Sequence, residues 1–190
     1  MPIYRAVAEG GPLGPFSILQ TRRAPTNIHY LVDNLWEWKR PDEFPSRRHA
    51  VFASPSPELA LASATAAHAR AYRVVIESGE PCAQIVEQDA KDTEERKTLP
   101  RLIFRLLGEQ EFLSAPLEKK SAVAPLFCPC LTKEEVEQLF RTEPLAGHRE
   151  AVWSAIHFWE RAKLFSPHEN PPFPEGEVFF CASRYRLEPL

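Results

Sequence analysis

Prolines are spread through this sequence and restrict the length of any helix or strand that it can form. The chain has 19 prolines in 190 residues, and they lie between the segments with a regular hydrophobic pattern. Proline lacks a backbone N–H and biases the residue before it away from the helical region, so these positions mark loops. The sequence therefore predicts short elements joined by many loops, without internal repeats or low-complexity tracts.

Strand patterns and helix patterns alternate between these loops. The predicted strands are residues 3–8, 49–54, 72–77, 82–88 and a last strand after Gly176, and the predicted helices are 27–39, 59–70, 102–107, a segment around 136–140 and 148–164. Residues 89–98 are expected to form a charged loop or helix end, and 114–129 an irregular stretch. This order predicts an α+β fold, with one domain over residues 1–190, a mixed sheet, and additional helices in the second half.

The overall charge and hydropathy exclude several classes of protein. The formal net charge is −3 and no long basic stripe is visible, so nucleic-acid binding through bulk charge is not expected. No apolar run reaches membrane-spanning length, and no basic-then-apolar leader is visible. The expected location is the cytoplasm, or the outside of the cell after export without a signal peptide, and no membrane partner is expected.

The cysteines and histidines do not form a recognised metal motif. Four cysteines in a chain of this size do not indicate a disulfide framework. Cys128 and Cys130 are separated only by Pro129, but no second pair follows at a zinc-site spacing. His157, Glu160 and His168 lack the spacing of a zinc metalloprotease. We therefore expect no metal.

The stretch 174–187 places two carboxylates at the start of an apolar, aromatic strand. Glu175 and Glu177 flank Gly176, so on a strand both side chains would point to the same face. Two like charges this close repel each other unless they face water or a cationic ligand. The pattern is compatible with a solvated strand entrance and with a functional site.

Three stretches together suggest a definite chemistry. Tyr4-Arg5 lies on the first strand, Ser54-Pro55-Ser56 ends another strand, and Glu175-Gly176-Glu177 opens the last one. Arginine binds phosphate through a planar fork of donors, and a serine hydroxyl can orient a carboxylate or a ligand. A carboxylate stabilises positive charge on a sugar carbon as its leaving group departs. The combination suits cleavage of a nucleotide's glycosidic bond.

These stretches resemble the motifs of ADP-ribosyltransferases of the arginine–serine–glutamate class. That class has an arginine on an early strand, often after an aromatic residue, a Ser-Thr-Ser-like signature at a strand end, and a Glu/Gln-x-Glu motif that opens a late strand. The block 49–62 also resembles the strand, turn and helix that these enzymes place beside NAD. The resemblance implies a split β-sheet core of the ADP-ribosyltransferase type. The central region, 99–164, matches no motif of the class.

The resemblance assigns a role to each matching residue. Tyr4-Arg5 would bind a phosphate or ribose of NAD, and Ser54 and Ser56 would line the nicotinamide-ribose pocket or orient the acid. Glu177 would hydrogen-bond the ribose 2′-hydroxyl and stabilise the oxocarbenium ion, while Glu175 would activate the acceptor. The loop 166–174, with Phe173, would contact the target.

Charge alone, and not the family pattern, suggests a further contact. Arg47 and Arg48 lie in a turn before the strand 49–54, close enough in sequence for one of them to reach the pyrophosphate. Arg48 is the residue that we assign to this role.

Departures from the class leave alternatives open. Pro55 replaces the usual threonine, and more than half of the chain separates Ser56 from Glu177. Glu77, Glu87 and Asp89 are rival acids that lie closer in sequence. Some branches use histidine and tyrosine instead of arginine and serine, and His29-Tyr30 or His49 would be the counterparts.

The sequence thus predicts an NAD-dependent mono-ADP-ribosyltransferase that uses NAD as co-substrate and no metal. The expected acceptor is a macromolecule, with a protein favoured, and the expected context is a toxin or effector with a cognate inhibitor protein. With water as the nucleophile, the same site would make an NAD glycohydrolase. The alternative of another class is a non-catalytic protein-interaction domain, in which the acidic pair is merely surface.

Overall fold

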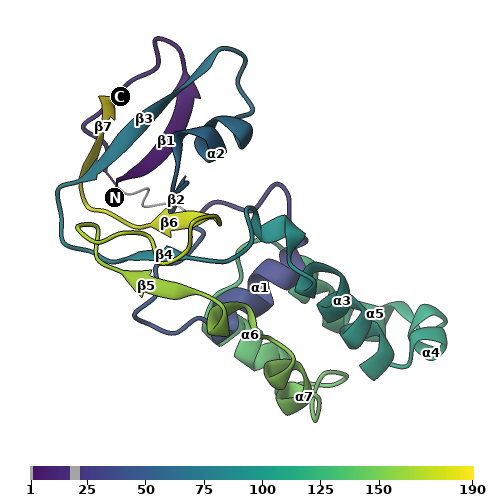
Figure 1. Cartoon of the computed structure of the whole chain (residues 1–190). Coiled ribbons are helices and arrows are strands. Elements are labelled where there is room, and N and C mark those ends of the chain that lie inside the picture. Colours follow the sequence, from purple (N-terminus) through teal and green to yellow (C-terminus); the bar gives the residue numbers. More distant parts are fainter. Residues whose placement is uncertain (1, 18–21) are drawn as a thin grey trace. The chain divides into compact units, whose positions relative to one another are not determined.

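The computed structural model describes residues 2–17 and 22–190, and these residues form two compact units (Figure 1). The first unit contains the described residues of Met1–Arg22, together with Asp42–Ala90 and Arg161–Leu190. The second unit contains Arg23–Pro41 and Lys91–Glu160. The chain therefore leaves the first unit twice, and each excursion contributes helical structure to the second.

The first unit is built from two small antiparallel sheets. One sheet has the strand order β1-β3-β7, formed by β1 (Ile3–Ala8), β3 (Ala69–Ile76) and β7 (Tyr185–Pro189). The other has the order β2-β6-β4-β5, formed by β2 (Val51–Ala53), β6 (Val178–Phe180), β4 (Cys82–Gln84) and β5 (Lys163–Phe165). The predicted α+β class is confirmed. The prediction of a mixed sheet is wrong, because every strand pair within the described residues is antiparallel.

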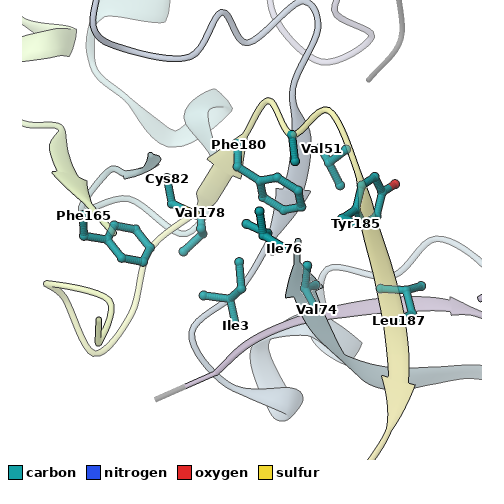
Figure 2. Close-up of a cluster of buried hydrophobic side chains, with 12 residues drawn as sticks. Ile3, Val51, Val74, Ile76, Cys82, Phe165, Val178, Phe180, Tyr185 and Leu187 are labelled. Carbon is teal, nitrogen blue, oxygen red and sulfur yellow. The ribbon is translucent and has the colours of Figure 1, made fainter. Parts of the chain in front are cut away.

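A single hydrophobic cluster joins side chains of both sheets (Figure 2). Alternate residues of each strand point into it, as the pleat of a strand requires. Its members are Ile3, Val74, Ile76, Tyr185 and Leu187 from the first sheet, and Val51, Ala53, Cys82, Phe165, Val178, Phe180 and Ala182 from the second sheet and its following turn. The two sheets of the first unit therefore share buried apolar side chains.

One helix of the first unit follows the end of β2. α2 (Pro57–Ala62) packs against β1 and β3. The order Ser56-Pro57-Glu58 predicts an N-cap at Ser56, and this is confirmed, because the Ser56 hydroxyl accepts a hydrogen bond of 3.2 Å from the backbone N–H of Leu59. Pro57 occupies the first helical position, where its missing N–H costs no hydrogen bond.

The second unit is helical over its described residues. Its elements are α1 (Tyr30–Lys39), α3 (Glu95–Leu106), α4 (Glu109–Leu113), α5 (Leu117–Val123), η2 (Ala124–Phe127), α6 (Lys133–Leu139), α7 (Arg149–Ser154) and η3 (Phe158–Glu160); the short turn η1 (Ala90–Asp92) precedes α3. α1 is its central helix, and Leu31, Leu35 and Trp36 are almost completely buried. The buried Asn34 amide donates to the carbonyls of Leu126 and Cys128. Thr132 followed three residues later by Glu135 predicts a capping box, and this pair of hydrogen bonds is present at the start of α6.

The long helix predicted over 148–164 is wrong. The helix α7 ends at Ser154, and the chain continues through η3 into β5. Lys39 donates to the carbonyls of Trp153 and Ile156 (3.0 and 2.6 Å), and the Glu95 carboxylate accepts from the N–H of His157 (3.0 Å). In a continuing helix these C=O and N–H groups would form hydrogen bonds with each other along the backbone. Here they form hydrogen bonds with distant side chains, so the helix ends there.

Four further expectations are corrected. The helix predicted over 59–70 stops at Ala62, because residues from Ala69 onward pair with β1 as part of β3. The predicted final strand is two strands, β6 and β7, which lie in different sheets. The stretch 114–129 contains α5 and η2 and is not irregular. Pro100 also lies inside α3, so the prolines do not all mark loops.

Candidate functional site

A cavity of about 290 Å³ opens in the first unit where the two sheets meet. Five parts of the chain supply its walls: β1, the end of β2, the end of α2 with the residues after it, the segment after β4, and the residue before β6. The lining residues are Tyr4, Arg5, Ala6, Phe52, Ala53, Ser54, Ala60, Ser63, Ala64, Thr65, Gln88, Asp89 and Glu177. The predicted arginine, serine and glutamate therefore line the same cavity.

Ser54 lies at the junction of the two sheets. Its backbone exchanges two hydrogen bonds of 2.8 Å with Tyr4, which forms an isolated bridge between β1 and the end of β2. In the pairing of β2 with β6, Ala53 lies opposite Val178, so one further step places Ser54 opposite Glu177. Backbone pairing thus connects Tyr4 to Ser54 and aligns Ser54 with Glu177, although these residues are far apart in sequence.

Arg5 extends from β1 toward β2. One of its terminal nitrogens, Nη1, donates a 2.9 Å hydrogen bond to the carbonyl of Phe52, and the side chain is half-buried. This bond holds the guanidinium against the cavity wall. The planar guanidinium of an arginine is a common binding group for phosphate and carboxylate oxyanions.

Glu177 lies at the mouth of β6 and pairs with Arg47. Val178 and Phe180 point into the core, so Glu177 and Phe179 point to the other face. The Nη1 of Arg47 donates to Oε1 of Glu177, and its guanidinium carbon lies 4.9 Å from the ring centre of Phe52 and 5.1 Å from that of Phe179. The carboxylate is thus fixed by a cation that is itself packed on two aromatic rings.

Gly176 allows the chain to reach this position. Its φ is +111°, and a Cβ at this residue would lie 2.0 Å from the carbonyl oxygen of Ile85. The neighbouring Glu177 continues the ladder, since its N–H donates to the carbonyl of Glu87 (2.8 Å) and its carbonyl accepts from the N–H of Ile85 (3.1 Å). The glycine between the two glutamates is therefore a steric requirement of the fold.

Glu175 is exposed and does not line the cavity. Its carboxylate accepts a 3.1 Å hydrogen bond from Nε2 of Gln88. The preceding loop is held by Gln84, whose completely buried amide donates to the carbonyls of Phe173 and Glu175 and accepts from the N–H of Phe173. This single side chain sets the path of the loop into the Glu-Gly-Glu motif.

Two of the predicted NAD-binding residues lie elsewhere. Ser56 caps α2 and does not line the cavity, since its hydroxyl accepts from the N–H of Leu59. Arg48 is 2% exposed and is also outside the lining, so the assignment of this arginine to the pyrophosphate has no geometric basis. Arg47, its neighbour, is the arginine that approaches the acid.

Of the three rival acids, one lines the cavity and two do not. Glu77 pairs with Arg184 and Arg186, and Glu87 pairs with Arg161; neither glutamate lines the cavity. Asp89 does line it, half-buried, and is the rival that lies inside the site.

The alternative histidines also lie outside the lining of the cavity. His29 immediately precedes α1 in the second unit, and Tyr30 is the first residue of that helix. His49 precedes β2 and is not a lining residue. Arg5, Ser54 and Glu177 line the cavity, whereas His29, Tyr30 and His49 do not.

Comparison with protein-family models, curated protein sequences and solved structures gave no match. The assignment of the site therefore depends on its own residues and geometry.

Two properties of the described residues bear on other kinds of site. Over residues 2–17 and 22–190, no group of three or more His, Cys, Asp and Glu side chains is arranged to hold a metal ion. Within the same residues, we find no helix with the length and apolar character needed to cross a bilayer.

Two residues that shape the site, Arg47 and Gln84, have roles that the sequence patterns do not predict. The sequence suggests only phosphate binding for Arg47, because nothing in it links this arginine to a glutamate far along the chain. Gln84 was one polar residue in a predicted strand, and its neighbours Ala83 and Ile85 gave no sign of a partner. A signal for Gln84 was available, since an amide in the middle of an apolar strand needs a buried hydrogen-bond partner.

Proposed function

We propose that the chain is an NAD-dependent mono-ADP-ribosyltransferase, with the cavity lined by Arg5, Ser54 and Glu177 as its active site. The observation that carries the proposal is that these three residues, from the first strand, the middle of the chain and the last part of the sequence, line one cavity. Their chemical types are those needed to bind a phosphate, orient a ribose and stabilise a sugar cation.

The size of the cavity agrees with partial enclosure of the co-substrate. Pockets that enclose most of a drug-sized ligand measure about 300 to 1,000 Å³, and this cavity of about 290 Å³ lies at the small end. It suits the nicotinamide-ribose half of NAD, with the adenosine half outside. We assign Arg5, whose guanidinium donates to the carbonyl of Phe52, to a phosphate at the boundary between the halves.

The proposed reaction breaks the bond between C1′ of the ribose and the nicotinamide nitrogen. The bonding electron pair leaves with nicotinamide, and C1′ becomes an oxocarbenium ion. The Glu177 carboxylate accepts a hydrogen bond from the ribose 2′-hydroxyl and stabilises this cation electrostatically. An acceptor nucleophile then adds to C1′ and gives its proton to Glu175, the exposed carboxylate outside the cavity that we assign to activating the acceptor.

The exchange Glu177→Gln tests the acid. Incubation of the purified protein with NAD should release nicotinamide, and the variant should release it at least about a hundredfold more slowly. Glu77→Gln, which alters a carboxylate outside the cavity, is the matched control and should keep wild-type activity. Equal rates for wild type and Glu177→Gln would remove Glu177 from the mechanism, and Asp89→Asn would then test the remaining acid of the cavity.

Labelled NAD separates the proposed outcomes. Label retained on a macromolecule after denaturation supports transfer, whereas free ADP-ribose in amounts equal to nicotinamide identifies an NAD glycohydrolase. If wild type releases no nicotinamide and calorimetric titration detects no NAD binding, the protein is not an enzyme of this kind. If the wild type binds NAD, the Arg5→Ala variant should bind NAD with lower affinity in the same titration.

A further inference from the structure

The second unit carries a groove that the proposed reaction does not use. It lies along α3 and α7, which pack against each other, and has a volume of about 1120 Å³. Its lining consists of Thr98, Leu99, Arg101, Leu102, Arg105, Leu106 and Glu109 from α3 and the start of α4, and Ala151, Ser154 and Ala155 from α7 and its C-cap. All of these residues belong to the second unit.

The floor of this groove is apolar and made partly of small residues. Leu102 and Leu106 are half-buried on α3, one turn apart, and Ala151 and Ala155 have the same spacing on α7. Small side chains allow the backbone of another helix to approach closely, because the distance between packed helices depends on the side chains at the contact. The groove therefore has the surface of a helix-packing site.

A row of positive charges runs along α3. Lys97, Arg101 and Arg105 are each four residues apart and exposed, so their Cα atoms lie about 6 Å apart along the helix axis. Like charges at this spacing repel each other and weaken a helix. Within residues 2–17 and 22–190, no acidic side chain forms an ion pair with any of the three. The row is therefore complementary to a negatively charged partner.

We propose that this groove is the docking site of an acidic amphipathic helix of a partner protein. The apolar face of the helix would lie on Leu102, Leu106 and Ala151, and its carboxylates would pair with Arg101 and Arg105 at the edge. This is the helix-in-groove mode of recognition, in which one face gives affinity and the rim charges select the partner. A nucleic-acid backbone would satisfy the arginines but leave the leucine and alanine floor without a partner. The proposal is independent of the NAD reaction.

A designed peptide provides the probe. A fluorescein-labelled peptide of about 18 residues, with leucines at helical spacing and glutamates elsewhere, is titrated with the full chain by fluorescence anisotropy. We expect binding in the micromolar range that weakens with salt. The same residues in shuffled order, which keep the charge but lose the apolar face, should bind at least about tenfold more weakly. Equal binding of both peptides would overturn the proposal.

Charge reversal locates the site. The double variant Arg101→Glu with Arg105→Glu should lose binding of the acidic peptide by at least about tenfold and gain binding of a matching peptide with lysines in place of glutamates. Lys119→Glu with Lys120→Glu makes the same change in net charge on α5, outside the groove, and is the control. An equal loss in the control pair would mean non-specific attraction and would overturn the assignment.

Filling the floor tests the apolar contact separately. Ala151→Trp adds bulk at an exposed residue and leaves every charge in place. It should abolish peptide binding while the circular dichroism and the melting temperature stay close to those of the wild type. Unchanged binding would contradict the proposal that the groove binds an acidic helix. Tighter binding of a DNA duplex than of the peptide would also contradict it. So would a concentration-dependent dimer of the chain that Ala151→Trp disrupts.

Discussion

The guanidinium of Arg47 holds the carboxylate of Glu177 and lies over the rings of Phe52 and Phe179. Both charged side chains are mostly buried, at 10% and 14% exposure. A buried charge that loses its partner keeps its desolvation cost, so each residue depends on the other. Arg47 therefore acts in the proposed mechanism as a positioning residue for the acid.

Arg47→Met should reduce the rate of nicotinamide release by about a hundredfold, because small displacements of a reacting group have effects of this size. The fall should appear mainly in kcat, and a double-mutant cycle with Glu177→Gln should show strong coupling, since both changes remove the same pair. Arg184→Met breaks an ion pair of the same unit at an exposed position and should leave kcat unchanged. Additive effects of the two site substitutions would show that Arg47 does not act through Glu177.

Gly176→Ala should destabilise the protein by about 2–4 kcal/mol, because a residue forced into such a backbone conformation also meets the oxygen of Ile85. Gly79→Ala is the matched control, since no atom lies within 4 Å of its added Cβ. Urea unfolding of both variants measures the difference. If Gly176→Ala and Gly79→Ala have the same midpoint, the close approach at Ile85 is not a constraint.

Gln84→Leu should loosen the loop that leads into Glu175. The substitution leaves the N–H of Phe173 and the carbonyls of Phe173 and Glu175 without their partner, at a cost of about 1–3 kcal/mol. Limited proteolysis should then cut within 166–175 faster than in the wild type. Gln88→Leu, which loses one exposed contact to Glu175, should be cut at the wild-type rate. Equal protection in both variants would refute the role of Gln84.

Acid should remove the stabilising effect of Glu137. Hydrogen bonds from Arg149, and then from Trp38, lower the pKa of this carboxyl in the folded state. A lowered pKa gives stability that is fully present above the unfolded-state pKa of about 4.3 and is lost as the pH falls through the folded-state pKa. Glu137→Gln should therefore melt below the wild type at pH 7, and the difference should shrink as the pH falls below about 4.3. A difference that persists unchanged in acid would contradict this linkage.

Local signals in the sequence predicted the elements that are set locally. The alternation of residues 3–8 identified β1, and Ser56-Pro57 and Thr132 with Glu135 identified two helix starts. These features depend on neighbouring residues and on the period of the apolar pattern, which the sequence displays directly. The convergence of Arg5, Ser54 and Glu177 on one cavity was also expected from the motifs.

Elements that depend on distant partners were not predictable in this way. Residues 148–164 have apolar positions at helical spacing, yet Lys39 and Glu95 end the helix from elsewhere in the chain. The alanine-rich segment 59–70 has high helix propensity, but pairing of Ala69 with Ala8 of β1 recruits it into β3. Tertiary contacts override local propensity in both cases.

The strand order β1-β3-β7 has a consequence for synthesis on the ribosome. The middle strand, β3, is flanked on one side by β1, which is synthesised before it, and on the other by β7 (Tyr185–Pro189), which is synthesised after it. A nascent chain therefore exposes one edge of β3 until residue 189 has left the exit tunnel. Prematurely terminated chains that end before Glu177 lack both β7 and this glutamate. Under the proposed function, activity would be withheld from incomplete translation products by the order in which the strands are made.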